Sequence, residues 1–154
     1  MNNNGNKMKV RHVIVKCGAD MYLPFAIVFG LAVILFGTVS PGGGFQGGVI
    51  ASSAAILLYL GYGFKTMKSA INPHLMHKGE ALGAIAYIAL ASIGLIAGGN
   101  FVRNAIYANG PAGNVISAGT ITFMSWAVGF KVLTGVAFLM MLLLSLLGGN
   151  QDEM

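Results

Sequence analysis

The chain has 154 residues, and only 8% of them are charged while 56% are hydrophobic. Soluble domains carry about 25% charged residues, so this composition excludes an ordinary soluble domain and indicates an integral membrane protein in a lipid bilayer. The formal net charge is +5, but the basic residues gather beside apolar runs, as topology signals do, and this pattern argues against a nucleic-acid partner.

A basic segment, residues 1–19, precedes the first apolar run, which extends over 21–39. We expect the segment to be a cytoplasmic tail. The apolar run is longer than the roughly 7 to 15 residues of a signal-peptide core, so it predicts a retained membrane helix. Asp20 follows Lys16 by four residues, a helical spacing that allows the two side chains to pair at the inner boundary.

The next feature is an eight-residue run, Pro-Gly-Gly-Gly-Phe-Gln-Gly-Gly, at positions 41–48. Pro41 lacks a backbone N–H and ends the preceding helix. Glycine permits tight turns and close backbone approach, so we predict a glycine-rich hairpin between the first two helices that displays Phe45 and Gln46. The glycines expected to form the structural turn are Gly42, Gly43, Gly44, Gly47 and Gly48.

The same run matches the Gly-x-Gly-x-x-Gly fingerprint of dinucleotide-binding folds in form only. That fingerprint follows a strand and needs an acidic residue about 20 positions later, whereas here a membrane span precedes it and the first downstream acid is Glu80. We therefore expect no cofactor in this chain. On the residues alone, the favoured interpretation of the run is a tight helical hairpin with one polar residue, Gln46, at the interface.

Two further apolar runs, 45–64 and 81–97, predict the second and third spans. Glu80 is expected at the inner boundary of the third span. His74 and His77 share a helical turn in the connection, but no acidic cluster adjoins them and the chain has one cysteine, so we expect no metal site.

The connection 98–127 mixes turn residues with an apolar stretch, 115–127, and the fourth span is predicted over 128–147. The apolar stretch fits an interfacial or re-entrant segment, or the first part of a long tilted fourth helix, and the sequence leaves these alternatives open. Lys131 lies about one turn inside the predicted span 128–147. An ionisable residue within a membrane is a functional hypothesis by default, whereas a lysine near a helix end also snorkels to the interface. We expect Lys131 to snorkel or to contact another subunit, with a proton relay as the open alternative.

These elements predict an all-α integral membrane protein with four transmembrane helices, in a single domain over residues 20–148 that is followed by a tail over 149–154. Four basic residues lie in the segment 1–19 and three between residues 65 and 78, which makes seven of the nine lysines and arginines. The positive-inside rule then places both termini in the cytoplasm, in a multi-pass protein of the cell membrane.

Two motifs carry a resemblance to a known family. The run at 41–48 resembles the Pro-Gly-Gly-Gly-Phe-x-Gly-Gly signature of the MnhB (MrpB) subunit of multisubunit sodium/proton antiporters. Residues 127–135, Ala-Val-Gly-Phe-Lys-Val-Leu-Thr-Gly, are similar to the Gly-x-Lys-Val-x-x-Gly segment near the C-terminus of that family. With the length and span count, the resemblance covers most of residues 21–147.

The resemblance implies a non-enzymatic, accessory membrane subunit of an assembly that exchanges sodium ions for protons. It implies other antiporter-module membrane subunits as partners and, in a related setting, hydrogenase-like or sulfur-reductase subunits of a respiratory redox complex. It associates Pro41 and Phe45 with sodium transport, and we add Gln46 and Lys131 as ion-path or subunit-contact residues. A purely structural scaffold without ion contact is the alternative, and a self-contained transporter of four spans is not expected.

Overall fold

The computed structural model describes residues 3–39, 41–96, 99–102, 104, 115–116 and 118–148. Over these residues the secondary structure is helical and contains no strand. The helices are α1 (Asn3–Phe36), α2 (Gly44–Ala70), α3 (Pro73–Ile96) and α4 (Thr120–Gly148). Each contains a stretch long and apolar enough to cross a membrane, which confirms the predicted all-α fold with four candidate spans.

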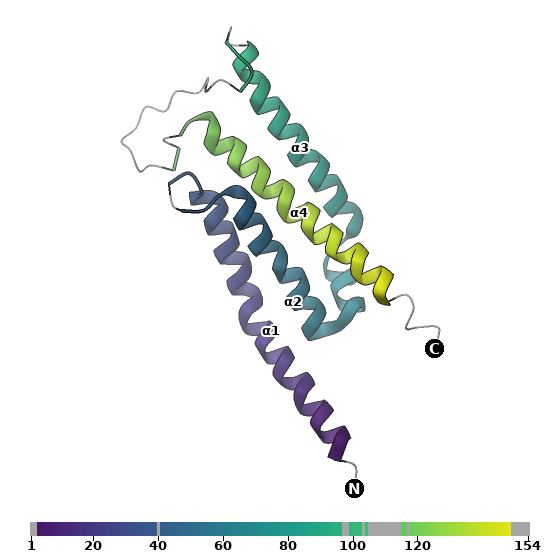
Figure 1. The fold of residues 1–154 in the computed structure, drawn as a ribbon. Coiled ribbons are helices and arrows are strands. Elements are labelled where there is room, and N and C mark those ends of the chain that lie inside the picture. The colour runs from purple at the N-terminus through teal and green to yellow at the C-terminus, as the bar shows by residue number, and fades with distance from the viewer. Residues whose placement is uncertain are drawn as a thin grey trace.

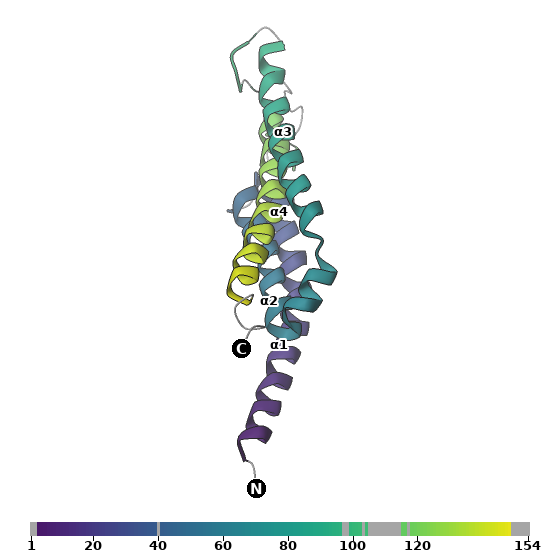
Figure 2. The same ribbon diagram turned by 90° about the vertical axis from the view of Figure 1, so that its right-hand side faces the viewer.

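The four helices lie side by side in one layer, in the spatial order α1, α2, α4, α3 (Figure 1). α2 packs between α1 and α4, and α4 packs between α2 and α3. Turned by 90°, the helices overlap in a narrow band (Figure 2), as expected for a flat layer rather than a closed bundle. Because a single layer has little interior, each helix buries only a narrow strip of its surface.

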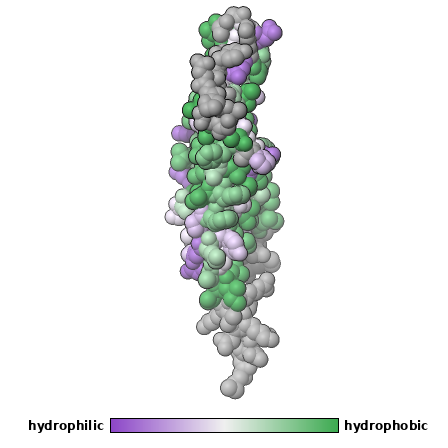
Figure 3. Space-filling view, turned by 90° about the vertical axis from the view of Figure 1, so that its left-hand side faces the viewer, coloured by the Kyte–Doolittle hydropathy of each residue, from purple (hydrophilic) through white to green (hydrophobic). Residues whose placement is uncertain are grey.

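Small side chains form most of that buried strip, and large apolar side chains point outward. Ala51, Ala55 and Ala91 are buried, whereas Phe25 and Ile85 are 65% and 64% exposed. Most of the coloured surface seen from the α1 edge is hydrophobic (Figure 3). Small residues allow helices to approach closely in lipid, and the exposed apolar surface suits contact with lipid or with other membrane proteins.

The helix bounds differ from the predicted spans at several ends. α1 begins at Asn3, so most of the segment 1–19 continues into the first span as one helix. α2 runs on to Ala70 across a kink at Gly63, whose φ of 82° is not helical, and α3 starts at Pro73, which shortens the expected connection to two residues. Asn72 explains the early start of α3, because its Oδ1 accepts a hydrogen bond from the backbone N–H of His74 at 3.1 Å, while a proline suits the first helical position.

The largest difference is at α4, which begins at Thr120, eight residues before the predicted fourth span. Asn104 caps this start from a distant part of the chain: its Oδ1 accepts a hydrogen bond from the Thr120 N–H at 2.9 Å. Gly119 turns the chain into the helix with a φ of 62°. Lys131 therefore lies eleven residues, or about 16 Å, beyond the start of α4 and not one turn inside it.

Candidate functional site

The glycine run holds the start of α2 between two other helices. A Cβ on Gly44 would lie 1.9 Å from the carbonyl oxygen of Ser125 on α4, and a Cβ on Gly47 would lie 2.7 Å from the carbonyl oxygen of Gly30 on α1. The Gly44 N–H also donates a hydrogen bond to Ser125 Oγ at 3.1 Å. Only glycine allows these backbone contacts, so the first role of these positions is packing.

The larger residues of the run lie on the surface. Pro41 and Gln46 are exposed, and Phe45 is 58% exposed. The Gln46 Oε1 lies 2.6 Å from the point that a Cβ on Gly43 would occupy, so this side chain folds back over the N-terminus of α2, as residues at the third helical position do in a capping box. The structure places these three residues where a neighbouring subunit can reach them, and their role in ion transport stays a prediction.

A second candidate site lies between α3 and α4, where two oppositely charged residues occupy adjacent turns. A Cβ on Gly83 would be 2.8 Å from Lys131 Cβ, and a Cβ on Gly135 would be 3.2 Å from Glu80 Cδ. Glu80 and Gly83 are one turn apart on α3, as are Lys131 and Gly135 on α4. The absence of side chains at the two glycines therefore brings Glu80 and Lys131 into the same interface.

Lys131 lies near the middle of the apolar span of α4, and Glu80 lies close to the same level, about 7 Å from the midpoint of its own span on α3. The span of α4 covers Thr120–Leu147, so its midpoint falls between residues 133 and 134. Along the helix axis Lys131 is about 4 Å from that midpoint, and Gly135, which contacts Glu80, is about 2 Å from it. Sequence patterns alone predict opposite boundaries for the two residues. The sequence leaves open whether the stretch 115–127 belongs to the fourth helix, and in the structure α4 begins at Thr120, where Asn104 accepts a hydrogen bond from the backbone.

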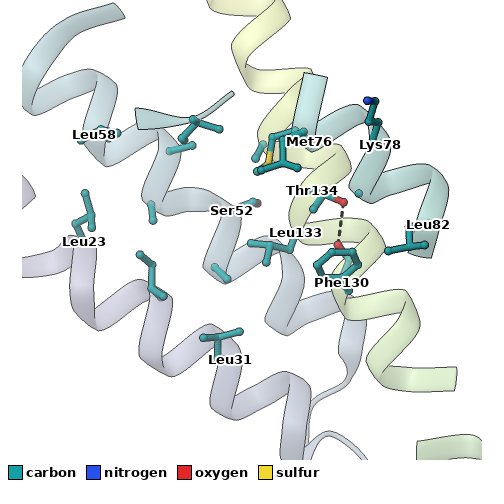
Figure 4. A pocket seen from close by; sticks show the side chains of 18 residues that line it. Leu23, Leu31, Ser52, Leu58, Met76, Lys78, Leu82, Phe130, Leu133 and Thr134 are labelled. Atoms are coloured by element: carbon teal, nitrogen blue, oxygen red, sulfur yellow. Dashed lines mark hydrogen bonds between the residues drawn. The ribbon is translucent and has the colours of Figure 1, made fainter. Parts of the chain in front are cut away.

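An apolar groove of about 710 Å³ opens on the layer between α1 and the α3–α4 pair. Ser52 Oγ donates a hydrogen bond to the Val49 carbonyl oxygen at 2.8 Å, and Thr134 Oγ1 donates to that of Phe130 at 2.9 Å (Figure 4). The lining hydroxyls are thus satisfied within their own helices, and the groove suits an apolar occupant. Figure 4 labels these lining residues: Leu23, Leu31, Ser52, Leu58, Met76, Lys78, Leu82, Phe130, Leu133 and Thr134.

At the end of α1 and α2 opposite the glycine run, a polar cluster joins the two helices. Tyr62 Oη donates a hydrogen bond to Asp20 Oδ1, and Lys16 Nζ lies 4.6 Å from the centroid of the Tyr62 ring. Asp20 pairs with Tyr62, while Lys16, which the helical spacing allows to pair with Asp20, lies over the Tyr62 ring. Sequence spacing along one helix could not reveal a partner on the next helix.

The two histidines of interest do not gather ligands for a metal. The His77 ring packs against the Phe138 ring at a centroid distance of 5.3 Å, and the His74 side chain is exposed. Within the part of the chain that the structure describes, no group of three His, Cys, Asp or Glu side chains is placed to hold a metal ion. The ionisable groups that remain of interest are Glu80 and Lys131.

The family profile described as a domain related to the MnhB subunit of the Na+/H+ antiporter matches residues 14–138. The chain belongs to the MnhB family. The matched region contains the glycine run, Glu80 and Lys131, so every candidate site described above lies within the MnhB domain. The chain is thus a multi-pass membrane protein of a transporter-subunit family.

Individual relatives agree with the MnhB assignment. The chain is 28% identical to the putative antiporter subunit mnhB2 of Staphylococcus epidermidis over 144 residues, which cover 93% of this chain and 99% of that protein. It is 35% identical to a Na(+)/H(+) antiporter subunit of Bacillus subtilis over 66 residues, which cover 43% of this chain and 46% of that protein. A protein of Methanocaldococcus jannaschii is 36% identical over 116 residues, and the chain spans only 44% of that longer relative.

Proposed function

We propose that this chain is an accessory membrane subunit of a multisubunit Na+/H+ antiporter, where it borders the cation path and contributes to assembly. The observation that supports ion handling is the position of Lys131, an exposed lysine near the middle of the apolar span of α4. A charged residue at that depth is costly and usually faces a water-filled cavity, an ion path or a charged partner. A single layer of helices cannot enclose a path, so other antiporter subunits complete it.

The exposed end of the glycine run supplies a second contact with the path. Phe45 and Pro41 carry no charge, so they shape the route or hold a neighbouring subunit, and Gln46 presents an amide that can bind water or an ion weakly. Sodium ions and protons are the transported species in this proposal, and the chain itself performs no bond chemistry. Both termini are proposed to be cytoplasmic, in the cell membrane.

Exchange measurements on the intact complex test the proposal. In inverted vesicles, Lys131→Met is expected to lower sodium-dependent proton exchange at least about tenfold, because the charge on the path is lost, while Lys131→Arg retains part of the activity. Lys65→Met is the matched control, since Lys65 is an exposed lysine in the last part of α2. Exchange at the wild-type rate in fully assembled Lys131→Met complexes would contradict the proposal.

The competing function is a structural scaffold without ion contact, which the close backbone contacts of Gly44 and Gly47 favour. Phe45→Ala and Gln46→Ala distinguish the two, because each removes an exposed side chain without touching these contacts. Reduced exchange in complexes that copurify intact supports the path, whereas unaltered exchange supports the scaffold.

Copurification from native membranes distinguishes a free antiporter from a redox complex. Hydrogenase-like or sulfur-reductase subunits that coelute with the chain would place it in a redox complex.

A further inference from the structure

We propose that Glu80 and Lys131 form a proton-binding pair inside the membrane, in which the Glu80 carboxylate accepts the proton and the Lys131 ammonium is its counter-ion. The inference rests on the proposed function for its place on the cation path. Proton binding by Glu80 can nevertheless be measured without transport.

The contacts between α3 and α4 determine which charged residues lie on adjacent turns. α3 and α4 run antiparallel, because Glu80 contacts α4 at Gly135 whereas Gly83, further along α3, contacts it at Lys131. The two charged residues are thus separated by about one helical turn, or roughly 5.4 Å along the axis. The structure shows no ion pair between the two side chains, so the proposed pair needs a change of side-chain rotamers but no movement of the helices.

α4 offers Glu80 one oppositely charged residue, Lys131, whereas His77 and Lys78 lie within one turn of Glu80 on α3 itself. Lys131 is the only charged residue between Thr120 and Gly148, and apolar residues occupy most of the neighbouring turns. Neither Glu80 nor Lys131 lines the apolar groove. Opposite charges on adjacent turns offset each other in a medium of low polarity, whereas either charge alone is expensive there.

Proton binding to Glu80 changes the net charge of the pair, so the pair does not hold a proton and a sodium ion at the same time. When Glu80 is ionised the pair is neutral overall, and a sodium ion can approach its carboxylate. When Glu80 binds a proton, Lys131 stays as an uncompensated cation and repels a sodium ion. The two ions therefore compete for the same place, which is the behaviour that an exchange path requires.

Several other titratable groups lie on the helices packed against α4. His77 and Lys78 lie within one turn of Glu80 on α3, but each has another contact. His77 packs on Phe138, Lys78 lines the groove, and Tyr62 binds Asp20. The full set on α2 and α3 besides Glu80 is Tyr59, Tyr62, Lys65, Lys68, His74, His77, Lys78 and Tyr87.

Carbodiimide labelling of the purified complex tests the pair directly. Dicyclohexylcarbodiimide reacts with protonated carboxyl groups in apolar surroundings, and mass spectrometry of the digested chain reports which residue carries the adduct. We expect labelling of Glu80 that falls as pH rises and that sodium chloride suppresses more than an equal concentration of choline chloride does. Asp20, which is held by Tyr62, is the internal control and should not respond to sodium.

Variants separate a counter-ion role from simple packing. Lys131→Met removes the charge that favours ionised Glu80, so labelling at neutral pH should rise about tenfold. Lys131→Arg keeps the charge and should restore labelling close to the wild-type level. Glu80→Gln should abolish the adduct at this position. The proposal is wrong if Glu80 stays unlabelled throughout the pH range, or if neither sodium nor Lys131→Met changes the extent of its labelling.

The results distinguish this inference from the proposed function. If labelling behaves as expected while Glu80→Gln and Lys131→Met complexes exchange ions at the wild-type rate, the pair binds a proton and the path proposal is wrong. If Lys131→Met stops exchange in assembled complexes but Glu80 labelling lacks the expected dependence, the path proposal holds and the pair is wrong.

Discussion

Gly83 lies directly against Lys131, so close that a Cβ on Gly83 would be 2.8 Å from the Lys131 Cβ and 3.0 Å from its Cα. The missing side chain brings α3 near enough to α4 for Glu80 to lie over Gly135. Any residue larger than glycine at position 83 has to move the lysine or separate the helices. The contact therefore connects packing to the placement of both charges.

Gly83→Ala should destabilise the chain, because the added methyl meets Lys131 backbone atoms that cannot move independently. Overpacking of this kind costs about 1 to 3 kcal/mol, and the thermal midpoint of the purified complex should fall. Gly18→Ala is the control, since a Cβ at Gly18 meets nothing within 4 Å and alanine favours helix. Equal midpoints for the two variants would show that the α3–α4 contact is looser than described.

Gly44→Ala should prevent normal packing of α2 on α4. The new Cβ would lie 1.9 Å from the Ser125 carbonyl oxygen, and this backbone atom cannot move away as a flexible side chain can. We expect little assembled complex in membrane extracts, measured by copurification. Gly42→Ala should assemble normally, since its Cβ would meet only a Val33 methyl at 3.1 Å. Normal assembly of both variants would argue against this helix contact.

Ser125→Ala tests the same contact with a smaller structural change. It removes the acceptor for the Gly44 N–H without adding any atom, so the helices stay in place and one hydrogen bond is lost. The expected cost is about 1 kcal/mol, seen as a small decrease in thermal midpoint with ion exchange preserved. A loss as large as that of Gly44→Ala would assign Ser125 a role beyond this hydrogen bond.

Asn104→Ala should weaken the beginning of α4, because it removes the acceptor for the Thr120 N–H. Loss of a helix cap costs about 0.5 to 2 kcal/mol. Amide hydrogen exchange should speed up in the first turn of α4 and stay unchanged around Lys131. Asn100→Ala provides the control, since Asn100 is exposed. If the backbone amides of Thr120 and Thr122 exchange hydrogen as slowly as in the unsubstituted protein, another group caps the helix.

Tyr62→Phe should loosen the contact between α1 and α2 by removing the hydroxyl that donates to Asp20. The phenylalanine ring keeps the cation–π contact with Lys16, so only a small decrease in thermal midpoint is expected. Tyr22→Phe is the comparison, because Tyr22 is an exposed tyrosine on α1. A double-mutant cycle with Asp20→Asn should show that the two substitutions are not additive.

The sequence was sufficient to predict four apolar helices, because hydropathy over a span length is a local property. It was also sufficient to identify the family, through the run at 41–48 and the segment around Lys131. The sequence leaves the start of α4 open, since Thr120, Thr122 and Ser125 are residue types common in loops while the apolar residues between them also fit a longer fourth helix. In the structure, Thr120 is capped by Asn104, while Thr122 donates to the Val115 carbonyl oxygen.

The position of Glu80 one helical turn from Lys131 was also beyond sequence reasoning. Each residue taken alone lies close to a predicted span end, and only the contacts of Gly83 and Gly135 place the two on adjacent turns. Helix propensity and hydropathy do not record which faces of two helices meet. The order of helices in the layer, with α4 between α2 and α3, likewise cannot be predicted from hydropathy or helix propensity.

The one-layer arrangement of the helices affects how the protein survives in a cell. A chain with two broad sides and almost no interior gains much of its stability only when neighbours cover those sides. Newly made copies that find no partner should be degraded by membrane proteases, so the amount of this chain would follow the supply of its partners. Its abundance would then be regulated by assembly as much as by synthesis.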